Sequence, residues 1–166
     1  MPTGPAARLT DPVAHPIPPV LTLGPGSTDV IIGFLPAWRG VPAGAAAAIQ
    51  SAKTVSDTTI KVAEAATLAA AGTPGAPAAK AAEEATKATA ATSMGAMIAS
   101  AAGMADKHAC TTPLPIPPPG PGVVVDGSQT VLIDNLPACR LGDTIIEPVG
   151  PPNKIVKGEM TVIIGG

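Results

Sequence analysis

The chain has 166 residues, enough for one compact domain or for one domain with an appendage. Hydrophobic residues make up 46% of the chain but aromatic residues only 1%, so rings that could line a large pocket or stack on bases are scarce. A formal net charge of −2 provides no positive field for phosphate, and we therefore expect no nucleic-acid partner.

The N-terminal part, residues 1–42, is rich in proline and glycine, which predicts short segments joined by turns rather than a long helix. Its first residues, MPTGPAARLTDP, lack the basic start and the apolar stretch of a secretory signal, so we expect no signal peptide. Further along, GSTDVIIGFLPAWRG at 26–40 places a glycine turn, a β-branched strand and a second turn in succession. This succession is typical of a β-hairpin.

Residues 43–105 have a different composition, in which alanine dominates and charged residues recur at helical spacing. We predict two helices, 44–71 and 76–104, joined by AGTPGAP, which has the glycine stop and proline start of an antiparallel helical hairpin. The most apolar stretch, 89–105, consists mainly of small residues and predicts a packed helix rather than a membrane span. The expected ion pairs along these helices are Asp57–Lys61, Lys80–Glu84 and Glu83–Lys87.

The C-terminal part, residues 106–166, repeats the hairpin pattern. GSQTVLIDNLPACRLGD at 127–143 matches 26–40, and GEMTVIIGG at 158–166 is a truncated third copy with a second turn at Gly165–Gly166. An ending in arginine also occurs three times, in PAAR, LPAWR and LPACR. We expect the three arginines to be structural, bonding turn carbonyls or pairing with Asp11 and Asp143; they are Arg8, Arg39 and Arg140.

In each copy an aspartate occurs downstream of the arginine. The residue four positions after that aspartate differs from copy to copy. The three steps are Asp11–His15, Asp106–Cys110 and Asp143–Glu147. If a pseudo-threefold axis relates the three copies, the second residues of these steps converge on one point. Two of the three, His15 and Cys110, are residue types that bind soft or borderline metals.

On these residues the chain resembles the PAAR-repeat family, whose name is spelled by residues 5–8. The family's leading motif, Ala-Ala-Arg, two residues, Asp, three residues and His, is complete at 6–15, and the resemblance covers residues 4–42 and 104–166. It implies a mainly β fold, a small cone of short repeated hairpins with pseudo-threefold character, here interrupted by the helical hairpin. It also implies a Zn²⁺ ion near the apex of the cone.

The resemblance implies a partner as well. The base of such a cone sits on the trimeric β-helical spike of a contractile injection system, such as the VgrG-type spike of type VI secretion. One asymmetric chain with three internal repeats makes one tip per trimer the natural stoichiometry.

A structural zinc needs four nitrogen, sulfur or oxygen ligands. His108 and Cys110 are two residues apart, so in a strand their side chains lie on the same side. Softness favours Cys139 as fourth ligand, whereas the repeat favours Glu147, because Cys139 occupies a packing position. A disulfide between Cys110 and Cys139 is a further alternative. The predicted ligands are His15, His108, Cys110 and Cys139, with Glu147 as the alternative fourth ligand.

The function implied by the resemblance is a structural spike tip without catalysis that helps to puncture a membrane and to deliver cargo. Such a tip would assemble in the bacterial cytoplasm and then leave the cell or enter a target cell, with transient contact with the target membrane. Two alternatives remain: residues 43–105 recruit a cargo protein or a chaperone, or the candidate ligands form a zinc-dependent hydrolase. The hydrolase is disfavoured because a closed four-ligand site leaves no position for water.

Overall fold

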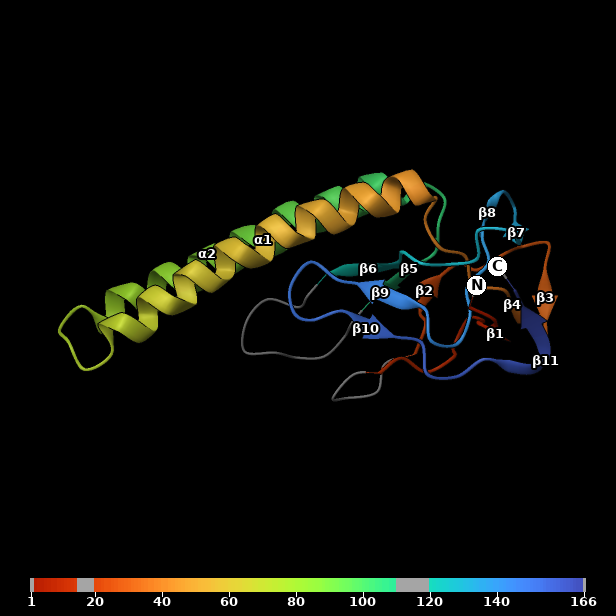
Figure 1. The fold of residues 1–166 in the computed structure, drawn as a ribbon, viewed down its shortest axis with the longest axis horizontal. Helices are drawn as coiled ribbons and strands as arrows, with labels where there is room; N and C mark the ends of the chain where they lie inside the picture. The colour runs from red at the N-terminus through yellow and green to blue at the C-terminus, as the bar shows by residue number, and fades with distance from the viewer. Residues whose placement is uncertain (1, 15–19, 110–119, 166) are drawn as a thin grey trace.

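A computed structural model describes residues 2–14, 20–109 and 120–165 of the chain. It contains two long helices and many short antiparallel strands, as expected for a mainly β fold with a helical hairpin (Figure 1). The helices are α1 (Ala43–Ala70) and α2 (Ala76–Ala102). The strands are β1 (Gly4–Ala6), β2 (Leu23–Gly24), β3 (Ile31–Ile32), β4 (Leu35–Pro36), β5 (Lys107–Ala109), β6 (Pro121–Val124), β7 (Leu132–Ile133), β8 (Leu136–Pro137), β9 (Thr144–Ile146), β10 (Asn153–Lys154) and β11 (Glu159–Ile164).

Two of the three sequence repeats form the predicted hairpins, β3–β4 and β7–β8. Each has a two-residue turn in which both residues have positive φ: 54° and 69° at Gly33 and Phe34, and 52° and 63° at Asp134 and Asn135. Turns of this kind match the right-handed twist of the flanking strands. The hairpin prediction is therefore confirmed for residues 26–40 and 127–143.

The third repeat is predicted to be a truncated hairpin, and the end of its expected turn at Gly165–Gly166 lies outside the described residues. Its strand β11 pairs with β1 at the other end of the chain, and Figure 1 shows the two termini close together. The three strand pairs have the same register, because an aliphatic residue lies opposite a proline in each of them. These pairs are Ile31↔Pro36, Leu132↔Pro137 and Ile163↔Pro5.

A closed ring of backbone hydrogen bonds joins the three repeats. The N–H of Ala7 donates to the carbonyl of Cys139 (2.9 Å), that of Cys139 to Trp38 (3.0 Å), and that of Trp38 to Ala7 (2.9 Å). The three side chains are buried in one apolar cluster. Each repeat thus contributes one residue to the ring and to the core beneath it.

A buried arginine–aspartate pair follows the ring in each repeat. In all three, the arginine backbone N–H donates to the aspartate Oδ2 at 2.8 Å, and the arginine Nε donates to the same carboxylate at 3.1–3.2 Å. Two of the pairs were predicted, whereas the third joins residues on either side of the helical hairpin. The pairs are Arg8–Asp11, Arg140–Asp143 and Arg39–Asp106.

The largest sheet has the order β10-β9-β6-β5-β2, with antiparallel neighbours. Isolated bridges join Val13 to Ile155, next to β10, and Pro12 to Val20, just before β2. Residues 12–13 therefore link the two edges of the sheet. The apolar cluster that contains the ring lies among these strands and includes Leu21.

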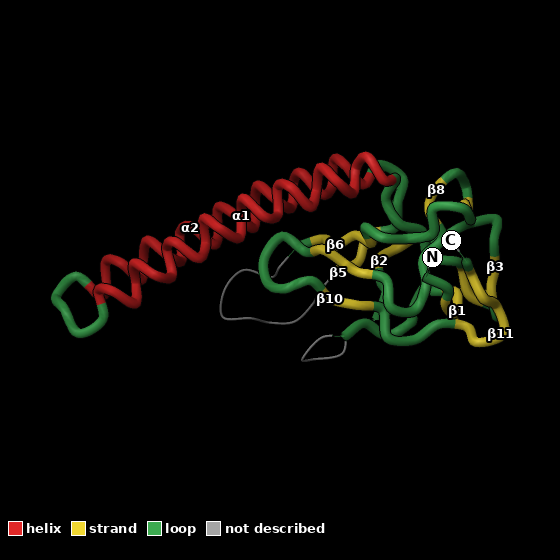
Figure 2. The backbone as a smooth tube through the Cα atoms, viewed as in Figure 1, coloured by secondary structure: helices red, strands yellow, loops and turns green. Residues whose placement is uncertain are grey.

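The helical hairpin projects away from the strands, so that only its base packs on them (Figure 2). Its bounds differ from the prediction by at most two residues, and its tip lies at the left of the view. At the base, a buried cluster joins Ile49 and Ile98 of the helices to Val123 and Ile146 of the sheet. Lys53 adds a polar contact, since its Nζ donates to the carbonyl of Gly150 at 2.9 Å.

Four ion pairs among the described residues stabilise the helices along and across the hairpin. The predicted Glu83–Lys87 pair forms at 2.7 Å, and Lys87 also reaches Glu64 on the other helix at 2.6 Å. Asp57 pairs with Lys53 rather than with the predicted Lys61, and Lys80 pairs with Glu83 rather than with Glu84. Among the residues that the structure describes, neither helix is long and apolar enough to cross a bilayer.

The buried pair across the helical hairpin yields a stability prediction. Asp106→Ala removes a carboxylate that accepts hydrogen bonds from the Arg39 guanidinium and from the backbone N–H groups of Gly26 and Arg39. Because it removes the buried counter-charge of the Arg39 guanidinium and leaves it only the partly exposed Asp134, we expect a loss of about 3 kcal/mol in the free energy of unfolding. Guanidinium denaturation followed by circular dichroism measures this loss.

The matched control is Asp29→Ala, which removes an exposed carboxylate bonded to the hydroxyl of Thr28. We expect this control to change the free energy of unfolding by less than about 0.5 kcal/mol. Equal effects of the two substitutions would contradict a structural role for the buried pair.

Candidate metal centre and hairpin face

Two of the predicted zinc ligands, His108 and Glu147, lie side by side in the interior. His108 is the central residue of β5, Glu147 follows β9, and both strands flank β6. The distance from His108 Nε2 to Glu147 Oε1 is 3.7 Å, and both side chains are almost fully buried. Sequence reasoning placed Glu147 at the equivalent of His15 and Cys110 and made it the alternative fourth ligand.

Glycine in β6 makes room for this pair. A Cβ atom on Gly122 would lie 2.9 Å from the Cγ atom of Glu147 and 2.9 Å from a methyl group of Ile145. Gly122 also lies opposite His108 in the register of β5 and β6. Any larger residue at this position would displace the Glu147 side chain from its place beside the histidine.

The environment of Glu147 makes its charge sensitive to a bound cation. Burial raises the pKa of Glu147 to about 7, although a hydrogen bond with Asn153 and the positive charge of Lys53 act in the opposite direction. A carboxylate with such a pKa is easily held in its charged form by a nearby metal ion. The nitrogen of His108 and the oxygen of Glu147 are both donors that zinc accepts.

The other two predicted ligands in the convergent set, His15 and Cys110, lie outside the described residues. Their chain neighbours are placed: the N–H of Ala14 donates to the carbonyl of Lys154 at 2.7 Å, and that of Ala109 donates to Thr22 at 2.9 Å. Within residues 2–14, 20–109 and 120–165, no group of three or more His, Cys, Asp or Glu side chains gathers around one point. The described residues therefore provide two adjacent metal donors, His108 and Glu147.

Cys139 lies in a different environment. It belongs to the backbone ring with Ala7 and Trp38, and its side chain is buried in the apolar cluster with Val124 and Ile145. Burial, followed by the negative charges of three aspartates, raises the pKa of its thiol well above the usual value. Among the described residues Cys139 is a free thiol, and its surroundings are those of a packed, neutral cysteine.

The three strand pairs expose a second feature, which sequence reasoning did not identify. The inner residues Ile32, Ile133 and Ile164 are buried together in one cluster. Their neighbours on the opposite side of the strands are exposed to similar extents, and we call this set the hairpin face. Its residues are Ile31 (56% exposed), Leu132 (55%) and Ile163 (60%).

A signal for the hairpin face was present in the sequence. A strand with one face in water alternates apolar and polar residues, whereas VII, VLI and VII are apolar at every position. The second apolar face of each strand is therefore available for a partner. In Figure 1, the strands β3, β7 and β11 all lie at the end of the molecule opposite the tip of the helical hairpin.

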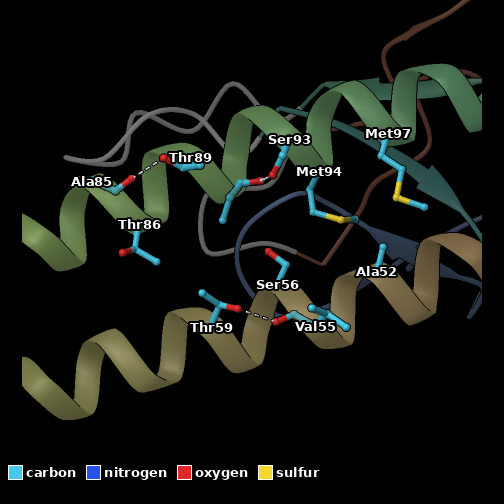
Figure 3. Close-up of a pocket in the computed structure, with 11 residues that line it drawn as sticks. Ala52, Val55, Ser56, Thr59, Ala85, Thr86, Thr89, Ser93, Met94 and Met97 are labelled. Carbon is cyan, nitrogen blue, oxygen red and sulfur yellow. Dashed lines mark hydrogen bonds between the residues drawn. The ribbon is translucent and has the colours of Figure 1, made fainter.

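A groove of about 740 Å³ runs between α1 and α2 (Figure 3). The residues that line it are Ala, Val, Ser, Thr and Met. Several of its hydroxyl groups bond carbonyls of their own helix, for example Thr59 to Val55 (3.0 Å) and Thr89 to Ala85 (2.9 Å). Because these threonine hydroxyls are satisfied internally, the groove presents mainly methyl groups, the sulfur atoms of Met94 and Met97, and the hydroxyl of Ser56, which has no hydrogen-bond partner among the described residues.

Comparison with known families finds the PAAR motif in residues 116–166. The match includes Glu147, both strands of the β7–β8 pair, and strand β11 of the β1–β11 pair. Comparison with curated proteins and with solved structures finds no match. The resemblance noted from the sequence is thus confirmed by a family match over this segment.

Proposed function

We propose that this chain, whose residues 116–166 carry a PAAR motif, is the tip of the spike of a contractile injection system of the type VI secretion kind. At the level of the family, the motif supports a structural spike-tip role and association with a spike. The finer proposal is a pseudo-threefold β cone whose hairpin face sits on a trimeric β-helical spike protein, with one tip per trimer. The tip would assemble in the cytoplasm, be carried out by the apparatus and help to puncture the target membrane.

The hairpin face is the observation that carries this proposal. Ile31, Leu132 and Ile163 each lie opposite a proline in their strand pairs, although β1–β11 has a register shift after Pro5, and they are exposed to nearly the same extent. Three equivalent apolar positions on one chain match a partner that offers the same surface three times, as a trimer does. Repetition of the backbone ring and of the arginine–aspartate pairs supports the same symmetry.

A structural zinc is the second part of the proposal. The ligand set that we propose is His15, His108, Cys110 and Glu147, and in this set Glu147 replaces Cys139, which packs in the apolar cluster. Within the described residues, the site fits a metal in one respect, since His108 and Glu147 are buried together beside a glycine that leaves them room. The bound ion would cross-link strands that have little aromatic core and would supply no catalysis.

Metal analysis tests the ligand set. Wild-type protein purified without added metal should contain about one zinc per chain by inductively coupled plasma mass spectrometry, as a closed structural site does. His108→Ala and Glu147→Ala should each lose most of the zinc and lower the melting temperature. The matched control Cys139→Ala removes a thiol and should keep the zinc. Loss of zinc in Cys139→Ala, or its retention in His108→Ala, would contradict this set.

Binding to the spike tests the hairpin face. In the triple variant Ile31→Ser, Leu132→Ser and Ile163→Ser, we expect affinity for a purified VgrG-type trimer from the same bacterium to fall by at least about 30-fold, because central apolar contacts dominate such interfaces. Titration calorimetry measures the affinity, and analytical ultracentrifugation should give one chain per trimer. The control variant Val55→Ser and Val62→Ser changes exposed apolar residues of α1 and should bind as the wild type does. Equal weakening of both variants would argue against this face.

A cargo adaptor is a second candidate function, and the groove between α1 and α2 is the observation that favours it. In this proposal the cone binds the spike while the helical hairpin recruits a cargo protein or a chaperone. The two functions are compatible and differ only in whether the groove binds a partner.

Removal of the helical hairpin tests the adaptor. Deleting residues 42–105 together with Val41→Gly leaves two residues between Arg39 and Asp106, as in Arg8–Asp11. The glycine suits this position, because its equivalents Thr10 and Gly142 have φ values of 72° and 92°. The shortened protein should still bind the spike trimer but should lose cargo proteins that co-purify with the wild type.

Ala52→Trp with Thr89→Trp fills the groove and should cause the same loss of cargo, because both residues line it. Val62→Trp, an exposed position on α1, serves as its control and should retain the cargo. An identical set of co-purifying proteins for all these variants would show that the hairpin does not recruit cargo.

A further inference from the structure

Phe34 is the most exposed large apolar side chain among the described residues, with 97% of its surface accessible. It is also the one phenylalanine in the chain. It occupies the second position of the turn between β3 and β4. A side chain of this size is usually buried, and Phe34 gains nothing from burial.

The backbone at Phe34 makes its presence more unusual. Its φ of 69° lies in the left-handed region, where a Cβ atom crowds the backbone. The equivalent turn between β7 and β8 has Asn135 at this position, a residue type that adopts the left-handed region readily. Folding therefore favours another residue at position 34, and stability does not account for the phenylalanine.

The turn that carries Phe34 is held in place. Arg8 and Glu159 form an ion pair of 2.5 Å next to Gly33, and a Cβ atom on Gly33 would lie 2.5 Å from the Glu159 carboxylate. The turn is therefore packed against this pair rather than free to move. A large side chain on a fixed turn loses little conformational freedom when it binds a partner.

Phe34 lies beside the hairpin face. Ile31, three residues earlier, belongs to that face, and the same hairpin carries both residues. The hairpin of Leu132 offers Asn135 in the corresponding place. The hairpins of Ile31 and Leu132 thus carry equivalent aliphatic residues of the hairpin face. Only the hairpin of Ile31 also carries an aromatic residue, Phe34.

We propose that Phe34 inserts into an apolar pocket of the trimeric spike protein and is the aromatic anchor of the chain on it. This inference rests on the proposed function, because the hairpin face supplies the surrounding contact. A symmetric trimer presents the same pocket three times, and one Phe34 fills one of them. Anchors of this kind, an exposed aromatic ring that enters a pocket, carry much of the affinity of protein interfaces.

Binding of the purified VgrG-type trimer by Phe34→Asn tests the inference. We expect the affinity to fall by at least about 30-fold while the melting temperature stays the same or rises, because asparagine suits the turn. The control Asn135→Ala changes the equivalent turn and should bind within about twofold of the wild type. If the wild type binds and Phe34→Asn binds equally well, Phe34 is not an anchor, although the proposed function stands. Failure of the wild type to bind overturns both.

Moving the aromatic residue tests whether the pocket is repeated around the trimer. Adding Asn135→Phe to Phe34→Asn transfers the ring to the equivalent hairpin, one third of a turn away in the proposed symmetry. On a symmetric trimer this double variant should regain most of the lost affinity, because a matching pocket faces the second hairpin. Without such recovery, the proposal that Phe34 enters a pocket that the trimer repeats three times is wrong.

Discussion

The fold depends on a buried ion pair that occurs three times. In each pair the aspartate accepts the backbone N–H and the guanidinium of an arginine, so a buried charge is both neutralised and hydrogen-bonded. The far side of each guanidinium then bonds a segment distant in the chain: Arg8 bonds Glu159, Arg39 bonds Asp134, and Arg140 bonds the carbonyl of Pro2. Arg39 and Arg140 therefore join their own repeats to another, whereas Arg8 joins the two ends of the chain within one repeat. Such links between repeats are important for stability, because only 1% of the residues are aromatic and few large side chains are available to fill the core.

The same ion pair explains how the fold tolerates its helical hairpin. Two residues separate Arg8 from Asp11, whereas the whole helical hairpin separates Arg39 from Asp106, yet the hydrogen bond from the arginine N–H to Oδ2 is 2.8 Å in both. The helical hairpin therefore enters and leaves at neighbouring points and does not alter the repeat into which it is inserted. Closing a long loop costs little more than closing a moderate one, because the entropy grows only with the logarithm of loop length.

Sequence patterns predicted the local elements well, because hairpin turns and helical ends depend on a few adjacent residues. GF and DN stand at the turns of β3–β4 and β7–β8, and the glycine and proline of AGTPGAP mark the helix ends. The pairing of β11 with β1 was missed, since the two strands lie at opposite ends of the chain and no turn connects them. Arg39–Asp106 was missed for the same reason. The choice between Cys139 and Glu147 stayed open because repeat position and donor softness favoured different residues.

The two aromatic residues, Trp38 and Phe34, occupy positions at which the repeats differ. Trp38 lies in the backbone ring, where the other repeats have Ala7 and Cys139, and all three side chains share one buried space. Three tryptophans would overfill that space and three alanines would leave a cavity, so one large and two small side chains are the arrangement that packs. Packing of the core requires this difference between the repeats. It does not require the difference between the turns, because Phe34 is exposed to solvent. An internal repeat therefore leads to a chain with one distinct edge, and this edge carries the one exposed aromatic side chain.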